Sequence, residues 1–227
     1  MALLGRAALA MWWDIAPAVR KDFEHWHSHE HFPERLAIPG FRRASRWHAA
    51  DGGEGVFVLY ELDDHGVLAS PAYVARLDAP SPWSTRLMPE HRHMVRSQCH
   101  VVASHGFGVG RFAETLRLAA APGRDVELRE AIDALGRNAR ARAGLVGLHL
   151  LHHEAPAIGT TIEQRLRGMA DASADHVIVA VAYDDAALST LARDELGDVA
   201  LGRVGAVGSI ERGRYLLAAS ATPADIA

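Results

Sequence analysis

Four histidines occupy alternate positions from His25 to His31, a density that suggests either a metal site or a catalytic site. The run from His27 to His31 fits H-x-x-E-H, the pattern of one class of zinc peptidases. On a helix at about 100° per residue, His25 and His29 share one side, while His27 and His31 flank the apolar side. The four rings therefore cannot bind one ion together, and at most His27 and His31 could share one.

A catalytic zinc ion typically takes three protein ligands, so this pattern needs a further ligand from elsewhere in the chain. Glu61, Glu114 and His149 are candidates, and their spacing does not choose among them. The chain has 14 histidines in 227 residues, so a match to this short pattern can arise by chance. We therefore expect no metal site, and zinc hydrolysis is a minor alternative.

The segment from His31 to Arg35 is the better candidate for chemistry. We expect His31 at the C-terminal end of its helix, where the dipole favours a protonated ring that could act as a general acid or base. Glu34 could orient that ring, and Arg35 could bind an acidic substituent through its forked guanidinium. The structural alternative is a capping histidine beside a local ion pair of Glu34 and Arg35.

Five side chains on expected strands could line a ligand pocket, namely Arg46, Trp47, Tyr60, His100 and His149. Neighbours on a strand point to opposite faces, so Trp47 cannot share a side with Arg46. Trp47 would offer a flat surface to an aromatic ligand, or it packs beneath a helix. Polar groups on inward faces would orient the ligand, but the sequence does not decide which faces point inward.

The elements that must position these residues follow from hydrophobic periodicity and turn signals. In residues 1–106 we predict strands over 7–14, 41–49, 56–62 and 94–104, and helices over 17–32 and 63–77. A proline-rich connection covers 78–92. The order strand, helix, strand, strand, helix, strand is that of the ferredoxin-like motif.

The same order returns in residues 107–227, after a glycine-rich seam at 104–110. We predict strands over 111–121, 145–154, 176–183 and 212–220, helices over 123–144 and 184–196, and a loop with one helical turn over 159–175. Two such repeats can bury the uncovered faces of their sheets against each other. The predicted fold class is therefore α+β, with repeats 1–106 and 107–227 closing into a barrel within one chain.

Composition argues against several classes of function. The net charge is −4, with no basic stripe, so we expect no nucleic-acid partner. No apolar run reaches the roughly 18 residues of a membrane helix, and the apolar start of the chain, broken by Arg6, suits a strand better than an export signal. The single cysteine, Cys99, leaves no intramolecular disulfide framework, and we expect a cytoplasmic protein.

The segment 22–47, followed by a strand that ends in two aspartates, resembles EthD-like proteins of the dimeric α/β-barrel superfamily. The matching features are Trp26, the pair Glu30-His31, Pro33-Glu34-Arg35, and Pro39-Gly40-Phe41 leading into a strand. The resemblance covers residues 7–85, whereas 107–227 match in element order alone. It implies an intramolecular dimeric α/β-barrel of ferredoxin-like units with a ligand cavity.

Members of that superfamily are similar to cofactor-free monooxygenases, polyketide cyclases, muconolactone isomerases and decarboxylases, which act on small and often aromatic compounds. Tandem members also resemble the haem-binding chlorite dismutase group, which needs a proximal histidine in its second unit. The candidates here are His149, His152, His153 and His176. The second repeat has no counterpart of the His31 to Arg35 segment, so we expect one site, on the first repeat.

Three hypotheses result. The first is a cofactor-independent enzyme of cyclase, isomerase or monooxygenase type for a small aromatic or polyketide-like compound. In it His31 is the acid–base group, Glu34 orients it, and Arg35 or Arg46 binds an acidic substituent. The second is a non-catalytic ligand-binding or scaffold barrel, supported if its cavity is purely apolar; the third is a haem or metal protein. In the first two the partner is a small molecule, and the chain could also form a homodimer.

Overall fold

The computed structural model describes residues 2–168 and 171–226. Strands of the first half are β1 (Ala7–Asp14), β2 (Phe41–Ala49), β3 (Gly55–Leu62) and β4 (Arg92–Gly106). Its helices are α1 (Arg20–Trp26), α2 (Phe32–Leu36), α3 (Pro71–Leu77) and α4 (Pro82–Leu87), with shorter turns η1 (His27–His31), η2 (His65–Ala69) and η3 (Met88–Glu90). The second half contains β5 (Phe112–Ala120), α5 (Asp125–Ala139), β6 (Leu145–His153), α6 (Ile162–Arg167), β7 (His176–Ala182), α7 (Asp185–Asp194), α8 (Asp198–Arg203), β8 (Ala206–Ala221) and η4 (Pro223–Asp225).

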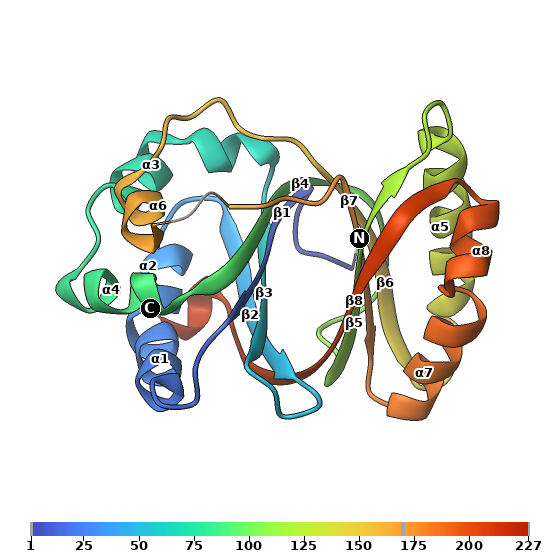
Figure 1. Cartoon of the computed structure of the whole chain (residues 1–227), viewed down its shortest axis with the longest axis horizontal. Coiled ribbons are helices and arrows are strands. Elements are labelled where there is room, and N and C mark those ends of the chain that lie inside the picture. The colour runs from blue at the N-terminus through green and yellow to red at the C-terminus, as the bar shows by residue number, and fades with distance from the viewer. Residues whose placement is uncertain (1, 169–170, 227) are drawn as a thin grey trace.

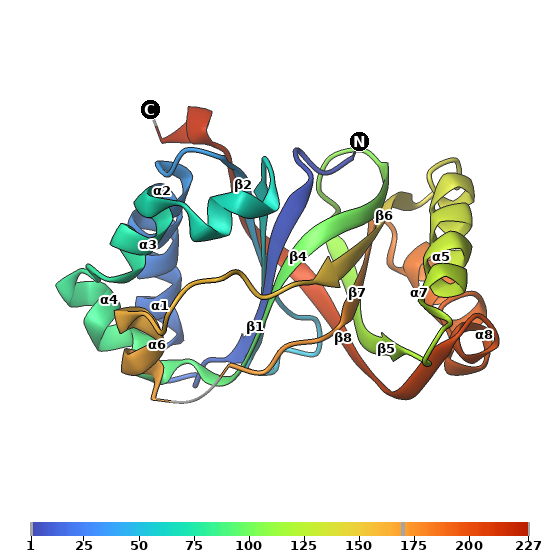
Figure 2. The same cartoon turned by 90° about the horizontal axis from the view of Figure 1, so that it is seen from above.

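The strands close into one barrel in the order β1-β3-β2-β8-β5-β7-β6-β4. Each half contributes the ferredoxin-like order, β4-β1-β3-β2 and β8-β5-β7-β6, and the antiparallel pairs β2–β8 and β4–β6 join the halves. Figures 1 and 2 show helices on two opposite sides of the strands, α1 to α4 with α6 on one side and α5, α7 and α8 on the other. The predicted fold class is confirmed.

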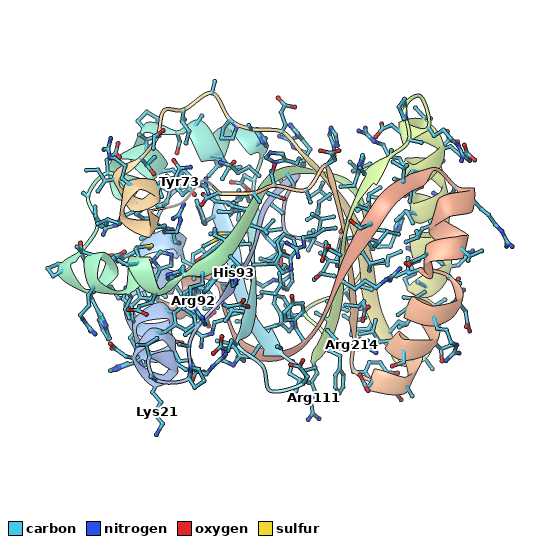
Figure 3. All side chains as sticks on the ribbon, in the orientation of Figure 1. Lys21, Tyr73, Arg92, His93, Arg111 and Arg214 are labelled. Carbon is cyan, nitrogen blue, oxygen red and sulfur yellow. The ribbon has the colours of Figure 1, made fainter. Side chains whose placement is uncertain are left out.

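Alternation along the strands separates three apolar clusters. On β1, Ala8, Ala10 and Trp12 point into the barrel, whereas Leu9 and Trp13 belong to the layer under the first half's helices. In the barrel interior, Trp12 and Trp47 each stack on Phe57, with ring centroids 5.1 and 5.2 Å apart. The third cluster lies between the other half of the barrel and α5, α7 and α8. Figure 3 shows the side chains that fill these three layers.

The long segment that contains the histidines is a helix of three parts, α1, η1 and α2. The backbone N–H of Phe32 donates to the carbonyl of His27, five residues back, which makes η1 a π-helical turn. In an α-helix Pro33 would have no N–H to donate to the carbonyl of His29, and its ring would clash with that carbonyl. The wider π-helical turn before Pro33 accommodates both effects. Because the helix continues to Leu36, His31 lies inside it, and the expectation that His31 ends its helix is wrong.

The segment from 154 to 168, which we call the strap, belongs to the second half in sequence but lies on the helices of the first half (Figure 1). Its residues Ile158 and Leu166 pack against the apolar cluster of the first half. Thr161 caps α6, because its hydroxyl accepts from the Gln164 N–H while the Gln164 side chain accepts from the Thr161 N–H. The sequence predicts one helical turn here, which α6 confirms; residues 169 and 170 of the predicted loop lie outside the described residues.

The predicted strands are all present, although β8 begins at Ala206 rather than at 212. The sequence predicts only a connection over 78–92, whereas the structure contains α4 and η3 there. Pro82 occupies the first turn of α4, and Ser81 caps it by accepting from the Ser84 N–H. Residue types that look like a loop therefore form a helix start. None of the helices within 2–168 and 171–226 is long and apolar enough to cross a membrane.

Candidate functional site

A small, largely enclosed cavity lies between the helices of the first half and the outer face of β1, β3 and β4. Its volume is about 30 Å³, which holds about two water molecules. The polar side chains that line it are His27, His31, Arg35, Tyr60, Tyr73, His91, Arg96, Thr161, Glu163, Gln164 and Arg167, and the apolar ones are Leu9, Met11, Trp13, Leu77, Met88 and Met94. The cavity thus combines an apolar surface with an unusual number of polar groups.

Four of these polar groups have no hydrogen-bond partner among the described residues: Nδ1 of His27, Nδ1 of His31, Nη1 of Arg35 and the hydroxyl of Tyr60. The indole Nε1 of Trp13, in the apolar part of the lining, is also without a partner there. All four residues are buried, with exposed fractions between 1% and 7%. Buried polar groups in folded proteins nearly always have a partner. Four unpaired groups around one cavity therefore indicate the place where a polar ligand would be bound.

The two buried histidines of η1, His27 and His31, are neutral at pH 7. Burial, and then the guanidinium of Arg35, hold the pKa of His31 well below its ordinary value. Burial and Arg46 do the same to the pKa of His27, and the two rings lie with their centroids 5.2 Å apart. A neutral imidazole can accept a proton, so His31 is a candidate base, and the expectation of a protonated ring is wrong.

His91, which sequence analysis did not select, also lines the cavity. Its Nδ1 lies 3.0 Å from the Leu87 carbonyl and 3.2 Å from the Met88 carbonyl, so Nδ1 carries the proton and Nε2 is the acceptor. Burial lowers the pKa of His91 to about 4. The residue follows η3, in the stretch that the sequence predicts as a plain connection, and no local pattern points to it.

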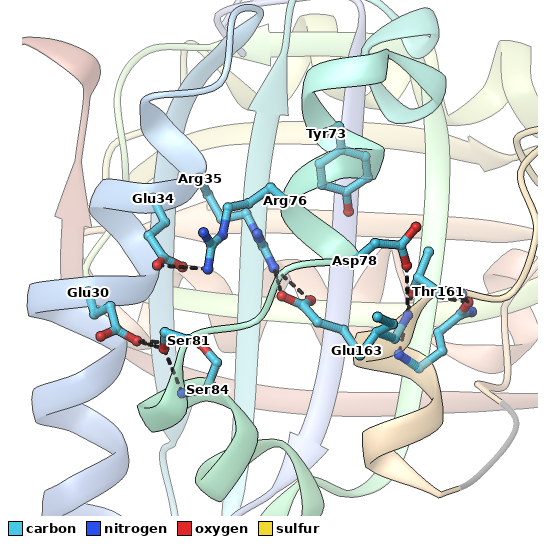
Figure 4. A network of polar contacts seen from close by, with 12 residues as sticks. Glu30, Glu34, Arg35, Tyr73, Arg76, Asp78, Ser81, Ser84, Thr161 and Glu163 are labelled. Carbon is cyan, nitrogen blue, oxygen red and sulfur yellow. Dashed lines mark hydrogen bonds and ion pairs between the residues drawn. The ribbon is translucent and has the colours of Figure 1, made fainter.

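Arg35 is held by a carboxylate from the strap rather than by its neighbour Glu34 (Figure 4). Its Nη2 donates to both carboxylate oxygens of Glu163, at 2.5 and 2.6 Å, and both side chains are almost fully buried. Burial disfavours the charge on Arg35, but Glu163 outweighs this and raises the pKa of Arg35. Because the pair uses Nη2, Nη1 is the guanidinium nitrogen left for a ligand.

Glu34 does not orient His31. Its carboxylate lies 3.0 Å from Nη2 of Arg76 on α3, and Figure 4 shows the two side chains pointing toward each other. Burial raises the pKa of Glu34, against the opposing effect of Arg76 and Arg35. We therefore correct both the catalytic role expected for Glu34 and the alternative of a local pair with Arg35: Glu34 ties α2 to α3.

Glu30, the glutamate of the H-x-x-E-H pattern, also forms hydrogen bonds that hold helices together. Its Oε1 accepts from Nε1 of Trp26 at 3.0 Å. It also accepts from the hydroxyls of Ser81 and Ser84, which joins η1 to the start of α4 (Figure 4). His27 and His31 line the cavity while Glu30 serves the helix contact. This arrangement does not support the zinc-peptidase alternative, in which that glutamate is the general base.

Of the candidates on strands, Tyr60 alone lines the cavity in the described structure. Burial raises the pKa of its phenol, so the hydroxyl stays protonated and can donate. Arg46 faces the same helical layer but lies over the rings of Phe23 and Phe32, at 5.7 and 6.0 Å, and donates to Ser28 Oγ at 3.1 Å. Its burial among helix contacts argues against the ligand-binding role expected for it.

Trp47, His100 and His149 lie away from the cavity, so the roles expected for them are not supported. Trp47 packs in the barrel interior, where its Nε1 donates to the Gly110 carbonyl at 3.3 Å. His149 alternates with residues that face α5, so it also points into the barrel, and its Nδ1 lies 3.0 Å from Ser104 Oγ. His100 is 45% exposed, stacks on His65 and pairs with Glu154 at 3.2 Å.

The remaining polar wall comes from segments far apart in sequence. Arg96 on β4 donates to the hydroxyl of Tyr73 on α3 at 2.8 Å, and Arg167 of the strap pairs with Asp171 at 2.6 Å. Arg96 and Tyr73 lie on different elements, so their contact has no local sequence signal, whereas Arg167 and Asp171 are a local pair four residues apart. Their positions follow only from the way the strap crosses onto the first half.

The four histidines considered for a haem ligand lie in different parts of the second half. His149 points into the barrel, His153 contacts Gln98 through Nδ1, and His152 and His176 face α5. The space between that sheet and its helices is filled by the apolar cluster that includes Leu128 and Ile132. These residues do not fit a haem.

The sequence matches no protein-family model and no curated protein. Solved structures are similar along the whole chain. A candidate monooxygenase from Fusobacterium nucleatum is 8% identical, with 97% of this chain and 96% of that chain covered and a TM-score of 0.63. An anthrone oxidase-like protein is 11% identical over 100% and 98% of the chains, at 0.64, and a candidate monooxygenase from Lactobacillus acidophilus is 12% identical over 96% and 97%, at 0.62. At these identities the likeness establishes the fold, a dimeric α/β-barrel of ferredoxin-like units.

Proposed function

We propose that this protein is a cofactor-independent enzyme that removes a proton from a small aromatic or polyketide-like compound in the cavity of the first half. The observation that carries the proposal is the convergence of four unpartnered polar groups, from His27, His31, Arg35 and Tyr60, on one cavity. A scaffold barrel has no need of such groups, because each costs free energy when it is buried unpaired.

In this proposal His31 is the base. Its ring is buried and neutral, so its free nitrogen can take a proton from a phenol or from a carbon next to a carbonyl. Because the pKa of His31 is lowered, this step depends on stabilisation of the anion that it produces. The phenolate or enolate that results carries a negative charge, which Nη1 of Arg35 and the hydroxyl of Tyr60 would stabilise in a site with little water. His27 lies beside His31 and would accept a hydrogen bond from a substrate hydroxyl.

Entry of the substrate requires the strap to move. A cavity of about 30 Å³ is far smaller than the roughly 150 Å³ that a benzene-sized ligand occupies. The strap supplies one wall through Thr161, Glu163, Gln164 and Arg167, and it is held by Arg35 and by the Asp78 carboxylate, which accepts from the Ile162 N–H at 2.9 Å. Outward movement of α6 would enlarge the cavity and free both terminal nitrogens of Arg35, Nη1 and Nη2, for an anionic substituent.

The structural neighbours support a small-molecule enzyme or binder of this fold, since their names include monooxygenases and an anthrone oxidase-like protein. Proton removal is also the first step of cyclisation and isomerisation, so the proposal covers the three reaction types. The EthD-like assignment, the repeat boundaries 1–106 and 107–227, a cytoplasmic location and homodimerisation belong to the same proposal and are not needed for the chemistry.

Anthrone is a suitable first probe, because it is a planar aromatic ketone with an acidic carbon. Under argon in D₂O, the wild-type protein should accelerate deuterium incorporation at that carbon, followed by NMR. His31→Gln should slow the catalysed exchange by at least roughly 100-fold, whereas His100→Gln, which changes an exposed histidine outside the cavity, should not. Unchanged exchange in His31→Gln would remove His31 from the reaction.

The non-catalytic alternative predicts a different result in the same experiment. Its criterion, a cavity with apolar walls only and His31 outside it, does not match the described residues. If anthrone or a phenolic analogue binds, and Arg35→Met and Tyr60→Phe weaken that binding while the exchange rate stays at the buffer value, the protein is a binder.

A further inference from the structure

A second group of chemically capable side chains lies in the other half of the barrel, where β6 and β7 meet the start of α5. His152 and His176 are direct partners across the antiparallel β6–β7 pair, and their ring centroids are 4.8 Å apart. Asp125 is the first residue of α5, and its Oδ1 lies 2.9 Å from Nε2 of His176. One nitrogen of each ring and one carboxylate oxygen all lie within 4.8 Å of one another.

Strand alternation explains why the two rings face the same way. On β6, Leu148 and Leu150 pack in the cluster under α5, and His152 continues that face. On β7, Ile178 belongs to the same cluster, and His176 continues it toward the strand start. Asp125 meets them because α5 begins directly above this end of the sheet.

The polar atoms of this group are left without ordinary partners. His176 is only 2% exposed, yet neither of its ring nitrogens has a hydrogen-bond partner among the described residues, and neither has Nδ1 of His152. The 2.9 Å approach of Asp125 to Nε2 of His176 is close enough for a hydrogen bond but lacks the required direction. Two ligand atoms of one tetrahedral ion lie about 3.3 Å apart when each is about 2.0 Å from the ion, and both point at the ion rather than at each other. The separation and direction of the Asp125 and His176 atoms are close to this geometry.

The surrounding charges suit a cation held through one carboxylate oxygen. Nε of Arg129, one turn along α5, forms an ion pair with Oδ2 of Asp125 at 2.8 Å, without the direction of a hydrogen bond, and Oδ1 lies toward His176. Asp175, next to His176, adds a further negative charge, and the 40% exposed side chain of Asp125 gives an ion a route from solvent.

We propose that Asp125, His152 and His176 form a binding site for a divalent transition metal of the Zn²⁺ type. Two imidazole nitrogens and one carboxylate oxygen suit Zn²⁺ and its neighbours in the first transition row, whereas Mg²⁺ and Ca²⁺ prefer oxygen ligands throughout. Three protein ligands leave at least one position for water. The bound ion fastens the start of α5 to β6 and β7, and it lies in the opposite helical layer from the cavity proposed for catalysis.

The test uses the untagged full chain after treatment with EDTA and buffer exchange. Isothermal titration with ZnCl₂ should show one Zn²⁺ per chain, and Co²⁺ should give a visible d–d absorption band that Zn²⁺ abolishes. Asp125→Asn and His152→Ala should each weaken Zn²⁺ binding by roughly 100-fold. Zn²⁺ should raise the Tm of the wild-type protein and leave that of Asp125→Asn unchanged.

The matched control is His100→Ala, because His100 also stacks on a histidine and lies beside a carboxylate, but at an exposed position. This variant should bind Zn²⁺ as the wild type does. Asp125→Asn changes a partly exposed side chain at a helix start, so it keeps the test valid if His152→Ala does not fold. The proposal is overturned if the wild type binds no stoichiometric Zn²⁺, if Asp125→Asn binds it equally well, or if His100→Ala weakens binding as strongly.

Discussion

Nη2 of Arg35 donates to both carboxylate oxygens of Glu163, a residue 128 positions later in the chain. This buried pair joins α2 of the first half to the strap of the second. The candidate site is therefore completed by both halves, although its histidines come from the first half alone. The pair also sets how tightly the cavity is closed, which leads to the first two predictions.

Removing one member of the pair should destabilise the protein strongly. Glu163→Ala leaves the Arg35 guanidinium buried without its counter-charge, and the cost should be about 3–5 kcal/mol in the free energy of unfolding. Urea denaturation followed by tryptophan fluorescence measures it. The control is Asp194→Ala, which breaks an exposed, solvent-screened pair with Arg193 and should leave the free energy of unfolding nearly unchanged. Similar losses in the two variants would show that the Arg35–Glu163 pair contributes little.

The strap should open more readily than the helices beneath it. The α6 helix is short and rests on a few contacts, whereas α1 buries Phe23 and Trp26 completely. Backbone amides of 162–168 should exchange with D₂O faster than those of 23–30, as measured by hydrogen–deuterium exchange mass spectrometry. A bound phenolic ligand that replaces Glu163 on Arg35 should speed exchange in α6 further. Exchange in α6 as slow as in α1 would contradict entry by strap movement.

Tyr60→Phe should separate ligand binding from stability. The Tyr60 hydroxyl is buried without a partner, so its removal should raise the free energy of unfolding by about 1 kcal/mol rather than lower it. The same variant should lose affinity for a phenolate analogue and slow the proton exchange. Tyr73→Phe is the matched control, because the Tyr73 hydroxyl accepts from Arg96 and its loss should destabilise the fold. Destabilisation by Tyr60→Phe would mean that its hydroxyl has a structural partner.

The strands and the barrel could be predicted because local patterns determine them. Alternation of apolar side chains identifies each strand. Two ferredoxin-like repeats each leave one face of a sheet uncovered, and they can bury these faces against each other by closing into a barrel. Which face becomes the interior is not local: Trp47 points into the barrel because Ala44 and Arg46 take the face under the helices. A residue selected for its aromatic surface is thus part of the packed interior.

The candidate site was only partly predictable for the same reason. His31, Arg35 and Tyr60 could be selected because a helix turn and a strand carry them toward one layer. His91 was missed because a proline-rich stretch conceals α4 and η3, and Glu163 was missed because nothing in its neighbourhood shows that the strap crosses to the other half. The π-helical turn at η1 precedes Pro33, which the sequence displays, but no local pattern shows that the helix continues past this proline to Leu36.

Acid should destabilise the protein through its buried histidines. The pKa of His91 is about 4 in the folded state and 6.5 in the unfolded chain, so above pH 6.5 the ring is neutral in both and has no effect. Below 6.5 the unfolded chain binds a proton that the folded protein excludes, so this contribution to stability is lost as the pH falls. By pH 4 the loss amounts to about 3 kcal/mol, and His27 and His31, shifted in the same direction, add to it.

Urea denaturation between pH 7 and pH 4 measures how the free energy of unfolding changes with pH. The control is His91→Gln, whose amide can still donate to the Leu87 carbonyl. This variant removes the proton that His91 binds on unfolding and leaves the carboxylates unchanged. The difference between the two curves should therefore grow steadily below pH 6.5, and parallel curves would show that His91 titrates normally in the folded protein.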